Sequence, residues 1–523
     1  MKVRFTALLF CCYLIHASVF AQAPPIQFSK IFGGSREDIG NIIVQTSDKG
    51  FLIFGSTNST DGQVVGVIDS QMNSYDLWAI KTDSAGNLLW AKTILGRAST
   101  PWAAAEVSNA YVVGGYTYGN THDFAGFPSH NFPINYIAWL DKNDGHIMLA
   151  RNYDELIPGM NSTYDLKYLD DGSFLAVGNV SGDCWVAKIN TISGDTIWRK
   201  RYGGTLNDLG WSASVSDTAF YITGVTNSTN GDVTDNPGGP NGWVIKIDTA
   251  GQLLWSRTYD GDQYGWLTSM DRDPAGNLIC GGKAWGGGTH RSGYHAMRDY
   301  WVVKLSPDGD TLWCRCYGGS DEDDFSWLKA TNDGGAILCG ITESSDGDIS
   351  TPPSVSDFWI VRIDSNGAIV WDTTLGCTYA DRPGAVTTTC DGGYAFTGLV
   401  TGVTKDVTGT AFGSFEVWLC KLAPDGLDNT YCPTELHAEE SGALVKRVSI
   451  YPNPAENKVQ IDLGQAPGGP ISVLITDIAG KIISKHLLSA QVTTLDVSSL
   501  SKGLYFLNFP GSEIKQCVKL AID

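Results

Sequence analysis

Short apolar runs alternate with polar turns over most of this chain, and one run recurs with few changes. It starts with an acidic or amide residue, continues as aromatic-x-x-Lys-x-Asp, passes a glycine turn and reaches a second aromatic residue. Copies of it begin at Asp76, Asp183, Asn241, Asp299 and Asp357, and a shortened one begins at Glu416. Trp185, Trp243, Trp301 and Trp359 follow one another at intervals of 58 residues, and Trp418 comes 59 residues later. Such a fixed period is typical of a repeat protein.

A degenerate copy completes the series. The 107 residues from Trp78 to Trp185 contain "NYIAWLDKNDGHIML", which starts at Asn135 and brings the number of copies to seven. Between copies lie two more apolar runs bounded by Gly and Asp turns, for example "GWSASVSD" and "AFYITGVT". Each copy therefore predicts about four strands, which is the size of a propeller blade.

The two ends of the repeat region complement each other. The segment "FSKIFGG", residues 28–34, precedes the first copy, whereas the last copy stops at Gly426 without the equivalent strand. We expect the N-terminal strand to complete the last blade, because this would close the ring and remove exposed sheet edges. The prediction is an all-β protein with a seven-bladed β-propeller over residues 22–430. An open solenoid is the alternative, but it has no use for the complementary strand.

The repeated tryptophans suggest two roles. They are suited to stacking on sugars, but their recurrence at one position of nearly every copy favours packing between radially arranged sheets. The copies as a whole, over residues 28–426, resemble the β-propeller repeats of many secreted bacterial proteins, with the pattern "DxWxxKxDxxGxxxWxKxYGG".

The pattern changes after the repeats. Residues 431–446 are polar and irregular, as in a linker, and residues 447–523 contain short alternating strands with turns at Pro452, Gly480 and Gly503. This predicts a small Ig-like β-sandwich.

The C-terminal segment resembles the sorting domain of type IX secretion substrates. The resemblance is carried by Tyr451-Pro452-Asn453-Pro454, Asp477-x-x-Gly480-Lys481, Gly503-x-Tyr505 and a last strand with Lys519. It implies passage across the outer membrane by the type IX machinery and removal by a surface sortase, with attachment to lipopolysaccharide or release. The cut is expected between Cys432 and Val448. An ordinary accessory sandwich is the alternative.

The N-terminus has the features of a secretory signal peptide over residues 1–21. Lys2 and Arg4 precede an apolar run, residues 5–20, which ends at Ala21. No other stretch approaches the roughly 20 apolar residues of a membrane span. We therefore expect export through the inner membrane, then a location on the outer-membrane surface or outside the cell.

Charge and cysteine content narrow the function classes. The formal net charge is −20, which repels nucleic acid and anionic membranes, so neither is expected as a partner. Ten of the 12 cysteines follow the leader, without zinc-ligand spacing. Disulfides and buried thiols both remain open for them.

Two long loops depart from the repeat and are candidate ligand-binding segments. The second copy carries His122 and His130; the fifth carries Trp285, His290, Arg291 and His295. Aromatic, His and Arg side chains on loops of a rigid scaffold are typical of binding sites, although loop packing explains them as well. A glycan, a matrix protein or a surface protein is the expected ligand.

Acidic loops and turns should gather on the same face as these two segments. Asp321, Asp323, Asp346 and Asp348 are candidate calcium ligands, because hard cations prefer several oxygen ligands. The alternative is solvated turns, and no other cofactor is expected.

A catalytic reading requires a base, a nucleophile and orienting partners within reach of each other, and no such set is evident. The leading hypothesis is an exported binding or adhesion protein. The alternatives are a secreted enzyme acting on polysaccharide or peptide at the same face, and a structural surface-layer component.

Overall fold

The computed structural model describes residues 21–427 apart from 66–74, 97, 120–121, 129–130, 154–158, 160, 170, 260–263 and 288–290. Near the C-terminus it describes residues 449–451, 455, 457–463, 471–477, 482–509 and 518–522. The predicted signal peptide and linker therefore lie almost wholly outside the described residues. The chain divides into two compact units, Met1–Pro433 and Thr434–Asp523.

Within the described residues, the first unit consists of seven four-stranded antiparallel sheets, here called blades, and one short 3-10 helix, η1 (His122–Phe124). The innermost strands are β2 (Asp38–Gln45), β6 (Thr100–Val107), β10 (Ser162–Leu169), β14 (Asp208–Val215), β18 (Tyr264–Arg272), β22 (Asp323–Ala330) and β26 (Arg382–Thr388). The second strands are β3 (Phe51–Thr57), β7 (Ala110–Thr117), β11 (Ser173–Val180), β15 (Ala219–Thr226), β19 (Leu278–Trp285), β23 (Ala336–Thr342) and β27 (Tyr394–Val400). The third strands are β4 (Asp76–Thr82), β8 (Ile134–Leu140), β12 (Asp183–Asn190), β16 (Asn241–Asp248), β20 (Asp299–Leu305), β24 (Asp357–Ile363) and β28 (Glu416–Leu422). The outer strands are β5 (Leu88–Ile94), β9 (Ile147–Asn152), β13 (Thr196–Tyr202), β17 (Leu253–Tyr259), β21 (Thr311–Tyr317), β25 (Ile369–Leu375) and β1 (Ile26–Phe32).

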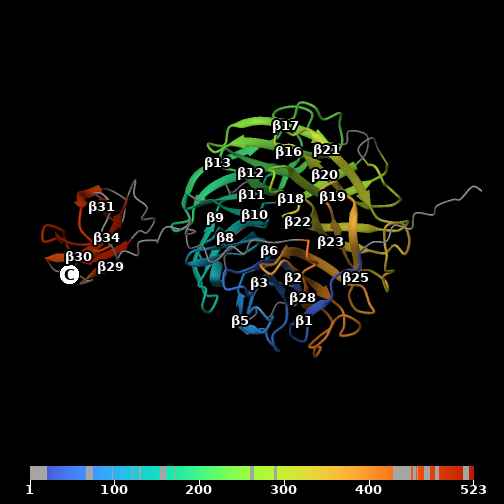
Figure 1. Ribbon diagram of the computed structural model, residues 1–523, viewed down its shortest axis with the longest axis horizontal. Helices are drawn as coiled ribbons and strands as arrows, with labels where there is room; N and C mark the ends of the chain where they lie inside the picture. Colours follow the sequence, from blue (N-terminus) through green and yellow to red (C-terminus); the bar gives the residue numbers. More distant parts are fainter. Residues whose placement is uncertain are drawn as a thin grey trace, which may run out of the picture. The chain divides into compact units, whose positions relative to one another are not determined.

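The blades follow one another around a common centre (Figure 1). Each innermost strand contacts the innermost strands of the two neighbouring blades, and β26 contacts β2. The arrangement is that of a β-propeller, as the repeats predict.

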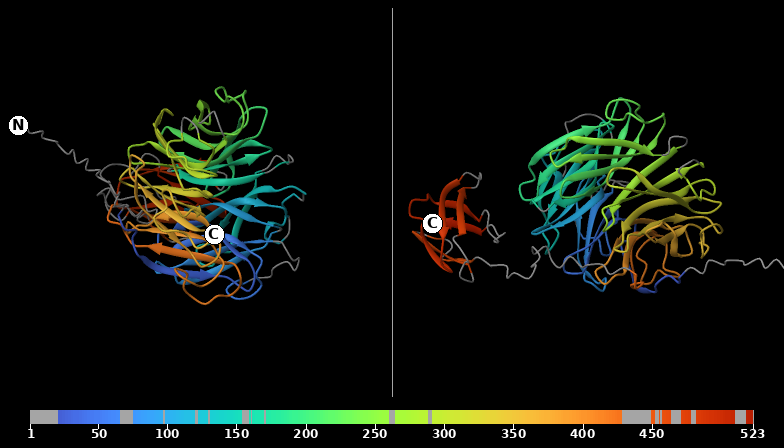
Figure 2. Two further views of the ribbon diagram at one scale, coloured as in Figure 1. Left: turned by 90° about the vertical axis from the view of Figure 1, so that its right-hand side faces the viewer. Right: turned by 45° about the horizontal axis from the view of Figure 1, so that its top comes forward.

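The N-terminal strand joins the last blade. β1 pairs antiparallel with β28, with Ile31 opposite Trp418, and the Trp418 indole donates a hydrogen bond of 2.9 Å to the Ser29 hydroxyl. The first and last segments of the unit, blue and orange, accordingly lie side by side (Figures 1 and 2). This exchange hydrogen-bonds the free side of β28.

The repeated tryptophans form the core between blades. Trp78, Trp185, Trp243, Trp301, Trp359 and Trp418 are each at most 3% exposed. In the degenerate second blade Tyr136 takes this position, because it pairs with Gly115 as Trp301 pairs with Gly282. The prediction of inter-blade packing is confirmed for these residues.

In three consecutive copies the second aromatic residue packs on the following blade. Trp198 lies against Gly251, Trp255 against Gly309 and Trp313 against Gly367, each glycine in the turn before an outer strand. The positive φ of these glycines, 76° to 83°, is a backbone conformation that favours glycine. The repeated "Gly turn, then Trp" pattern is therefore a contact between neighbouring blades.

Seven of the described cysteines are free thiols, and all of them but the half-buried Cys314 are buried. Burial raises the pKa of the thiols of Cys184, Cys280, Cys316, Cys339 and Cys420. Cys390 is disulfide-bonded. Both outcomes that the sequence leaves open therefore occur.

The second unit contains two sheets. One consists of β29 (Ser449–Tyr451), β30 (Lys458–Asp462) and β33 (Val492–Asp496); the other, in spatial order, of β32 (Ile482–Leu488), β31 (Ile471–Asp477), β34 (Gly503–Asn508) and β35 (Val518–Ile522). Alternate residues of these strands, such as Val459, Ile461, Val473 and Ile475, are buried in one apolar cluster. A separate core of this kind is what alternating strands predict.

None of the helices among the described residues is long and apolar enough to cross a membrane.

Candidate functional site

Each innermost strand of the propeller carries a β-bulge at nearly the same place. The register shifts fall around Asn41, Trp102, Tyr164, Trp211, Thr268, Ser326 and the pair Gly384–Ala385. A bulge adds one residue to its strand and redirects the side chain there. The neighbouring second strand has a glycine at this level: a Cβ atom added to Gly282 would collide with the carbonyl oxygen of Trp266.

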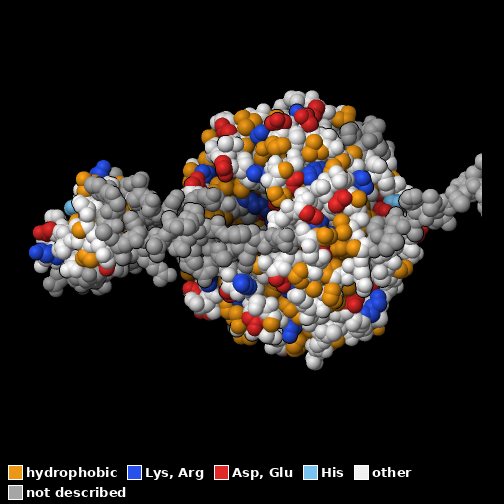
Figure 3. Space-filling view, viewed as in Figure 1, with side chains coloured by type: hydrophobic (Ala, Val, Ile, Leu, Met, Phe, Trp, Pro, Cys, Tyr) orange, Lys and Arg blue, Asp and Glu red, His pale blue; other side chains and the backbone are white. Residues whose placement is uncertain are grey.

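The bulged residues line a cavity of about 370 Å³ at the centre of the blades. All seven innermost strands contribute to it, through Asn41, Trp102, Tyr164, Trp211, Trp266, Thr268, Phe325, Ser326, Trp327, Arg382, Pro383 and Gly384 among others. The space-filling view shows the middle of the unit hollowed, with Lys and Arg side chains in the hollow (Figure 3). We call this cavity the channel site.

Aromatic side chains form one part of its wall. The ring of Tyr164 lies 6.1 Å from that of Trp102 and 4.3 Å from that of Trp211, measured between centroids. Trp102 and Trp266 are each 37% exposed, unlike the buried tryptophans between blades. The buried Nε1 of Trp211 has no hydrogen-bond partner among the described residues. These rings offer flat apolar faces to a ligand.

The other two blades contribute a mixed wall, in which the apolar Ile39 and Pro383 lie beside polar residues. β26 contributes Arg382 and Gly384, and β2 contributes Asn41. The Arg382 side chain is exposed and forms no ion pair with a described residue, while the Asn41 amide donates a hydrogen bond of 3.1 Å to the Pro101 carbonyl. Because β26 and β2 are neighbours, the aromatic and the mixed parts each form a continuous arc.

A network of charged and aromatic side chains borders the aromatic arc. Asp324 pairs with Lys283 at 2.5 Å and with Arg298 at 2.8 Å. The Arg298 guanidinium lies 5.1 Å from the Trp285 ring centroid, and Trp285 packs edge-on against Trp266 at 5.3 Å. Of the loop residues predicted to bind a ligand, Trp285 thus lies beside the channel site.

The other predicted loop residues lie elsewhere or outside the described part. His122 is exposed at the start of η1, and His130 and His290 lie outside the described residues. Arg291 is 3% exposed and donates hydrogen bonds to the carbonyl oxygens of Trp285 and Tyr264, at 2.7 and 2.8 Å. Its contacts hold the loop to the blade.

His295 lines a different cavity, of about 520 Å³, together with Arg315, Cys316 and Asp348. Its Nδ1 lies 3.2 Å from the buried carboxylate of Asp299, an arrangement that could orient a general base. Burial raises the pKa of the Cys316 thiol, so this sulfur is protonated at neutral pH and is no activated nucleophile.

The four predicted calcium ligands lie in two hydrogen-bonded segments on the loop face. The Asp346 carboxylate accepts a hydrogen bond from the Ser320 amide at 2.8 Å, and the Asp321 amide donates to the Ser344 hydroxyl at 2.9 Å. Asp323 is fully buried and accepts hydrogen bonds from the Gly319 amide and the Ser344 hydroxyl, at 2.7 and 2.9 Å. Asp348 accepts one from the Gly318 amide at 3.3 Å. These carboxylates hold the loops together.

Among the described residues, the group with suitable spacing for a metal ion is a different one, formed by Asp141, Asp144 and His146 in an exposed turn. The His146 Nδ1 already lies 2.6 Å from the Asp144 carboxylate.

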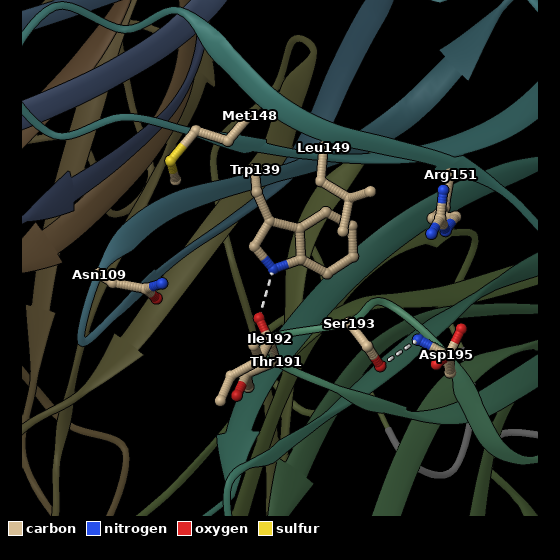
Figure 4. Close-up of a pocket in the computed structure, with 9 residues that line it drawn as sticks. All are labelled: Asn109, Trp139, Met148, Leu149, Arg151, Thr191, Ile192, Ser193 and Asp195. Carbon is tan, nitrogen blue, oxygen red and sulfur yellow. Dashed lines mark hydrogen bonds between the residues drawn. The ribbon is translucent and has the colours of Figure 1, made fainter. Parts of the chain in front are cut away.

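A further hollow of about 410 Å³ lies between the second and third blades (Figure 4). Its wall includes Met148 and the 78% exposed Ile192, and the Trp139 indole donates a hydrogen bond of 2.7 Å to the Thr191 carbonyl. Its neighbours in the view, Arg151 and Asp195, stand apart from the indole (Figure 4). The exposed apolar side chains make it a shallow surface feature.

The residues of the predicted sorting motifs lie on the strands of the second unit where they are described. Tyr451 ends β29, Gly503 begins β34, and Lys519 lies in β35. Asp477 pairs with Tyr505 across β31 and β34, which brings two of the motifs together. Pro452, Asn453, Pro454, Gly480 and Lys481 lie outside the described residues.

Residues 449–523 match the family described as the secretion system C-terminal sorting domain. The prediction of a type IX sorting domain is therefore confirmed, and it implies export to the cell surface or the extracellular space.

Solved structures similar to the chain include BamB from Moraxella catarrhalis, at 14% identity and a TM-score of 0.36, covering 76% of this chain and 99% of that one. The Dos1 propeller matches at 11% identity and a TM-score of 0.41, covering 75% and 94%. The C-terminal WD40 domain of Sif2 matches at 10% identity and a TM-score of 0.41, covering 77% and 99%. No curated protein matches the chain.

Proposed function

We propose that this chain is an exported binding protein whose propeller takes its ligand at the channel site. The observation that carries the proposal is the aromatic arc around a cavity of about 370 Å³, formed by Trp102, Tyr164, Trp211, Trp266 and Trp327. Pockets for small ligands have volumes of about 300–1,000 Å³ and combine apolar walls with a few polar groups. An adhesion role at the cell surface, toward a glycan, a matrix protein or a surface protein, fits this arrangement.

The proposal also includes the number of propeller blades and the fold of the second unit. We infer that the seven sheets are the blades of a closed seven-bladed propeller, because β1 completes the last blade and β26 contacts β2. The two-sheet core of the second unit supports an Ig-like sandwich. Removal of a leader after Ala21, and sortase cleavage between Cys432 and Val448, are the processing steps we expect.

The binding proposal is tested with the purified secreted protein. Tryptophan fluorescence and calorimetry would be followed while a panel of oligosaccharides and matrix proteins is added. We expect a ligand that changes the fluorescence, and a loss of affinity of at least tenfold in Trp102→Ala and Trp266→Ala. Tyr379→Ala is the matched control, because Tyr379 is 61% exposed on a loop and does not line the channel site.

Equal binding by all three variants would contradict the channel site. Absence of binding across the panel, together with turnover of an oligosaccharide or peptide, would favour the enzyme instead. His295→Ala would then identify whether the cavity around His295 is the active site.

The sorting role is tested separately by deleting residues from Val448 onward. We expect the truncated protein to accumulate in the periplasm, measured by fractionation and by protease accessibility on whole cells. Normal surface display of the truncated protein would contradict the role.

Calcium binding at Asp321, Asp323, Asp346 and Asp348 stays a separate prediction. Calorimetric titration with CaCl₂ tests it, and Asp346→Asn together with Asp348→Asn should remove any heat that comes from these loops.

A further inference from the structure

The geometry points to an acidic sugar, a uronic-acid residue of a polysaccharide, as the group that the channel site takes. This inference rests on the proposed binding function and adds the class of ligand. It starts from the order of the blades around the site, which separates the wall into an aromatic arc and a mixed arc.

The aromatic arc occupies five consecutive blades. Trp102, Tyr164, Trp211, Trp266 and Trp327 come from β6, β10, β14, β18 and β22 in turn. The remaining two blades contribute Arg382, Gly384 and Asn41. A ligand that fills the site therefore meets mainly aromatic surfaces on one side, together with Thr268, Lys283 and Ser326. On the other side it meets Arg382 and Asn41 beside Ile39 and Pro383. A pyranose ring with one carboxylate has this distribution, since its C–H face is apolar and its edge is polar.

The charge balance of the site selects an anion. The described residues that line the cavity include two cations, Lys283 and Arg382, and no Asp or Glu. Lys283 is paired with Asp324, at 2.5 Å. Arg382 is left as the cation of the cavity wall that has no described carboxylate partner. A guanidinium presents paired donors that match a carboxylate.

Hydrogen-bonding groups fit the same ligand. Thr268 and Ser326 line the cavity and carry hydroxyl groups, which can both donate and accept hydrogen bonds. Asn41 uses its amide nitrogen for Pro101, which leaves its carbonyl oxygen as an acceptor for a sugar hydroxyl. The volume, near the lower end for ligand pockets, suits about one or two sugar rings rather than a folded partner.

The experiment compares two probes on the purified secreted protein by calorimetry: trigalacturonic acid, and its methyl ester, in which the carboxylate charges are removed. We expect the acid to bind at least tenfold more tightly than the ester at low salt, with the preference shrinking as NaCl is raised. Arg382→Gln should reduce the acid-to-ester ratio to near one, and Arg382→Lys should restore part of it. Arg36→Gln, an exposed arginine on a loop outside the cavity, is the matched control and should keep the preference.

Equal affinity for acid and ester in the unaltered protein would overturn the acidic-sugar inference and leave the binding function standing. Tighter binding of poly-glutamate than of trigalacturonic acid would overturn it in favour of an acidic peptide. If no ligand of the wider panel binds, the proposed function itself fails.

Discussion

Two sets of aromatic residues in the propeller lie only a strand or two apart but have different surroundings. At the position opposite the glycine of the second strand, the third strand carries a buried tryptophan in six of the seven blades and a tyrosine in the other. The bulges of the innermost strands carry Asn41, Trp102, Tyr164, Trp211, Thr268 and Ser326, so the residue changes from blade to blade. Positions that are buried between neighbouring sheets in every blade keep nearly the same residue type. The bulges face a shared cavity, and there the repeat leaves the residue type free.

The sharpest test of this difference is stability. Trp301→Ala should lower the free energy of unfolding by about 3–5 kcal/mol, because it leaves a large cavity between two blades. Denaturant unfolding followed by circular dichroism measures it. A loss below about 1 kcal/mol would show that the inter-blade tryptophans are not the core.

Asp323 belongs to neither set of aromatic residues, and its buried carboxyl group should make the stability of the protein depend on pH. Burial, with the neighbouring Asp299 carboxylate, raises its pKa to about 6, despite hydrogen bonds that lower it. As pH rises from about 4 to 6, the unfolded chain loses this proton before the folded protein does, so the contribution of Asp323 to stability falls over that window. Asn cannot ionise. Between pH 4 and pH 7 the stability of the unaltered protein relative to Asp323→Asn should fall by about 2–3 kcal/mol.

Unfolding midpoints of both proteins across this pH range measure the difference. A difference independent of pH for Asp323→Asn would contradict the burial of its charge.

Gly282 contacts a member of each set of aromatic residues. It pairs with Trp301 on the third strand, and its backbone lies against the Trp266 carbonyl on the innermost strand. Gly282→Ala should cost about 1–3 kcal/mol and should also change the fluorescence of the channel tryptophans, since the added methyl collides with the Trp266 carbonyl. Gly287→Ala is the control, because its Cβ would meet a single atom, of Tyr294, at 3.6 Å. Loss of stability without a change at the channel site would show that the bulge does not depend on this glycine.

The smallest expected effect on stability is that of the channel tryptophans. Trp102→Ala should cost about 1 kcal/mol, because the ring is partly exposed and its main aromatic contact is Tyr164. Equilibrium unfolding of this variant beside Trp301→Ala gives the comparison directly. Similar losses for both would remove the distinction between core and channel.

The number and order of the strands predicted from the repeats agree with the fold. Residues 28–32 of the predicted segment lie in β1 and pair with β28 of the last blade, as the missing strand at the end of the repeats predicts. The channel site was not anticipated. The runs that contain Trp211 and Trp327 read as ordinary alternating strands, and the one available signal was that aligned copies differ at the bulge. The loop histidines and aspartates drew attention instead, because unusual residues in long loops are visible in a sequence.

By itself the sequence determined the period, the four strands of each copy, the closing strand and the sorting domain, because these depend on local patterns of apolar residues and on motifs. The tertiary structure decided which aromatic residues are buried in the core between blades and which line the channel site. Trp301 and Trp266 look alike along the chain, but register and bulges decide which of them is enclosed by two sheets and which faces the centre. It also decided that Arg382 lines one cavity with residues more than 200 positions away, such as Trp102, because β26 contacts β2.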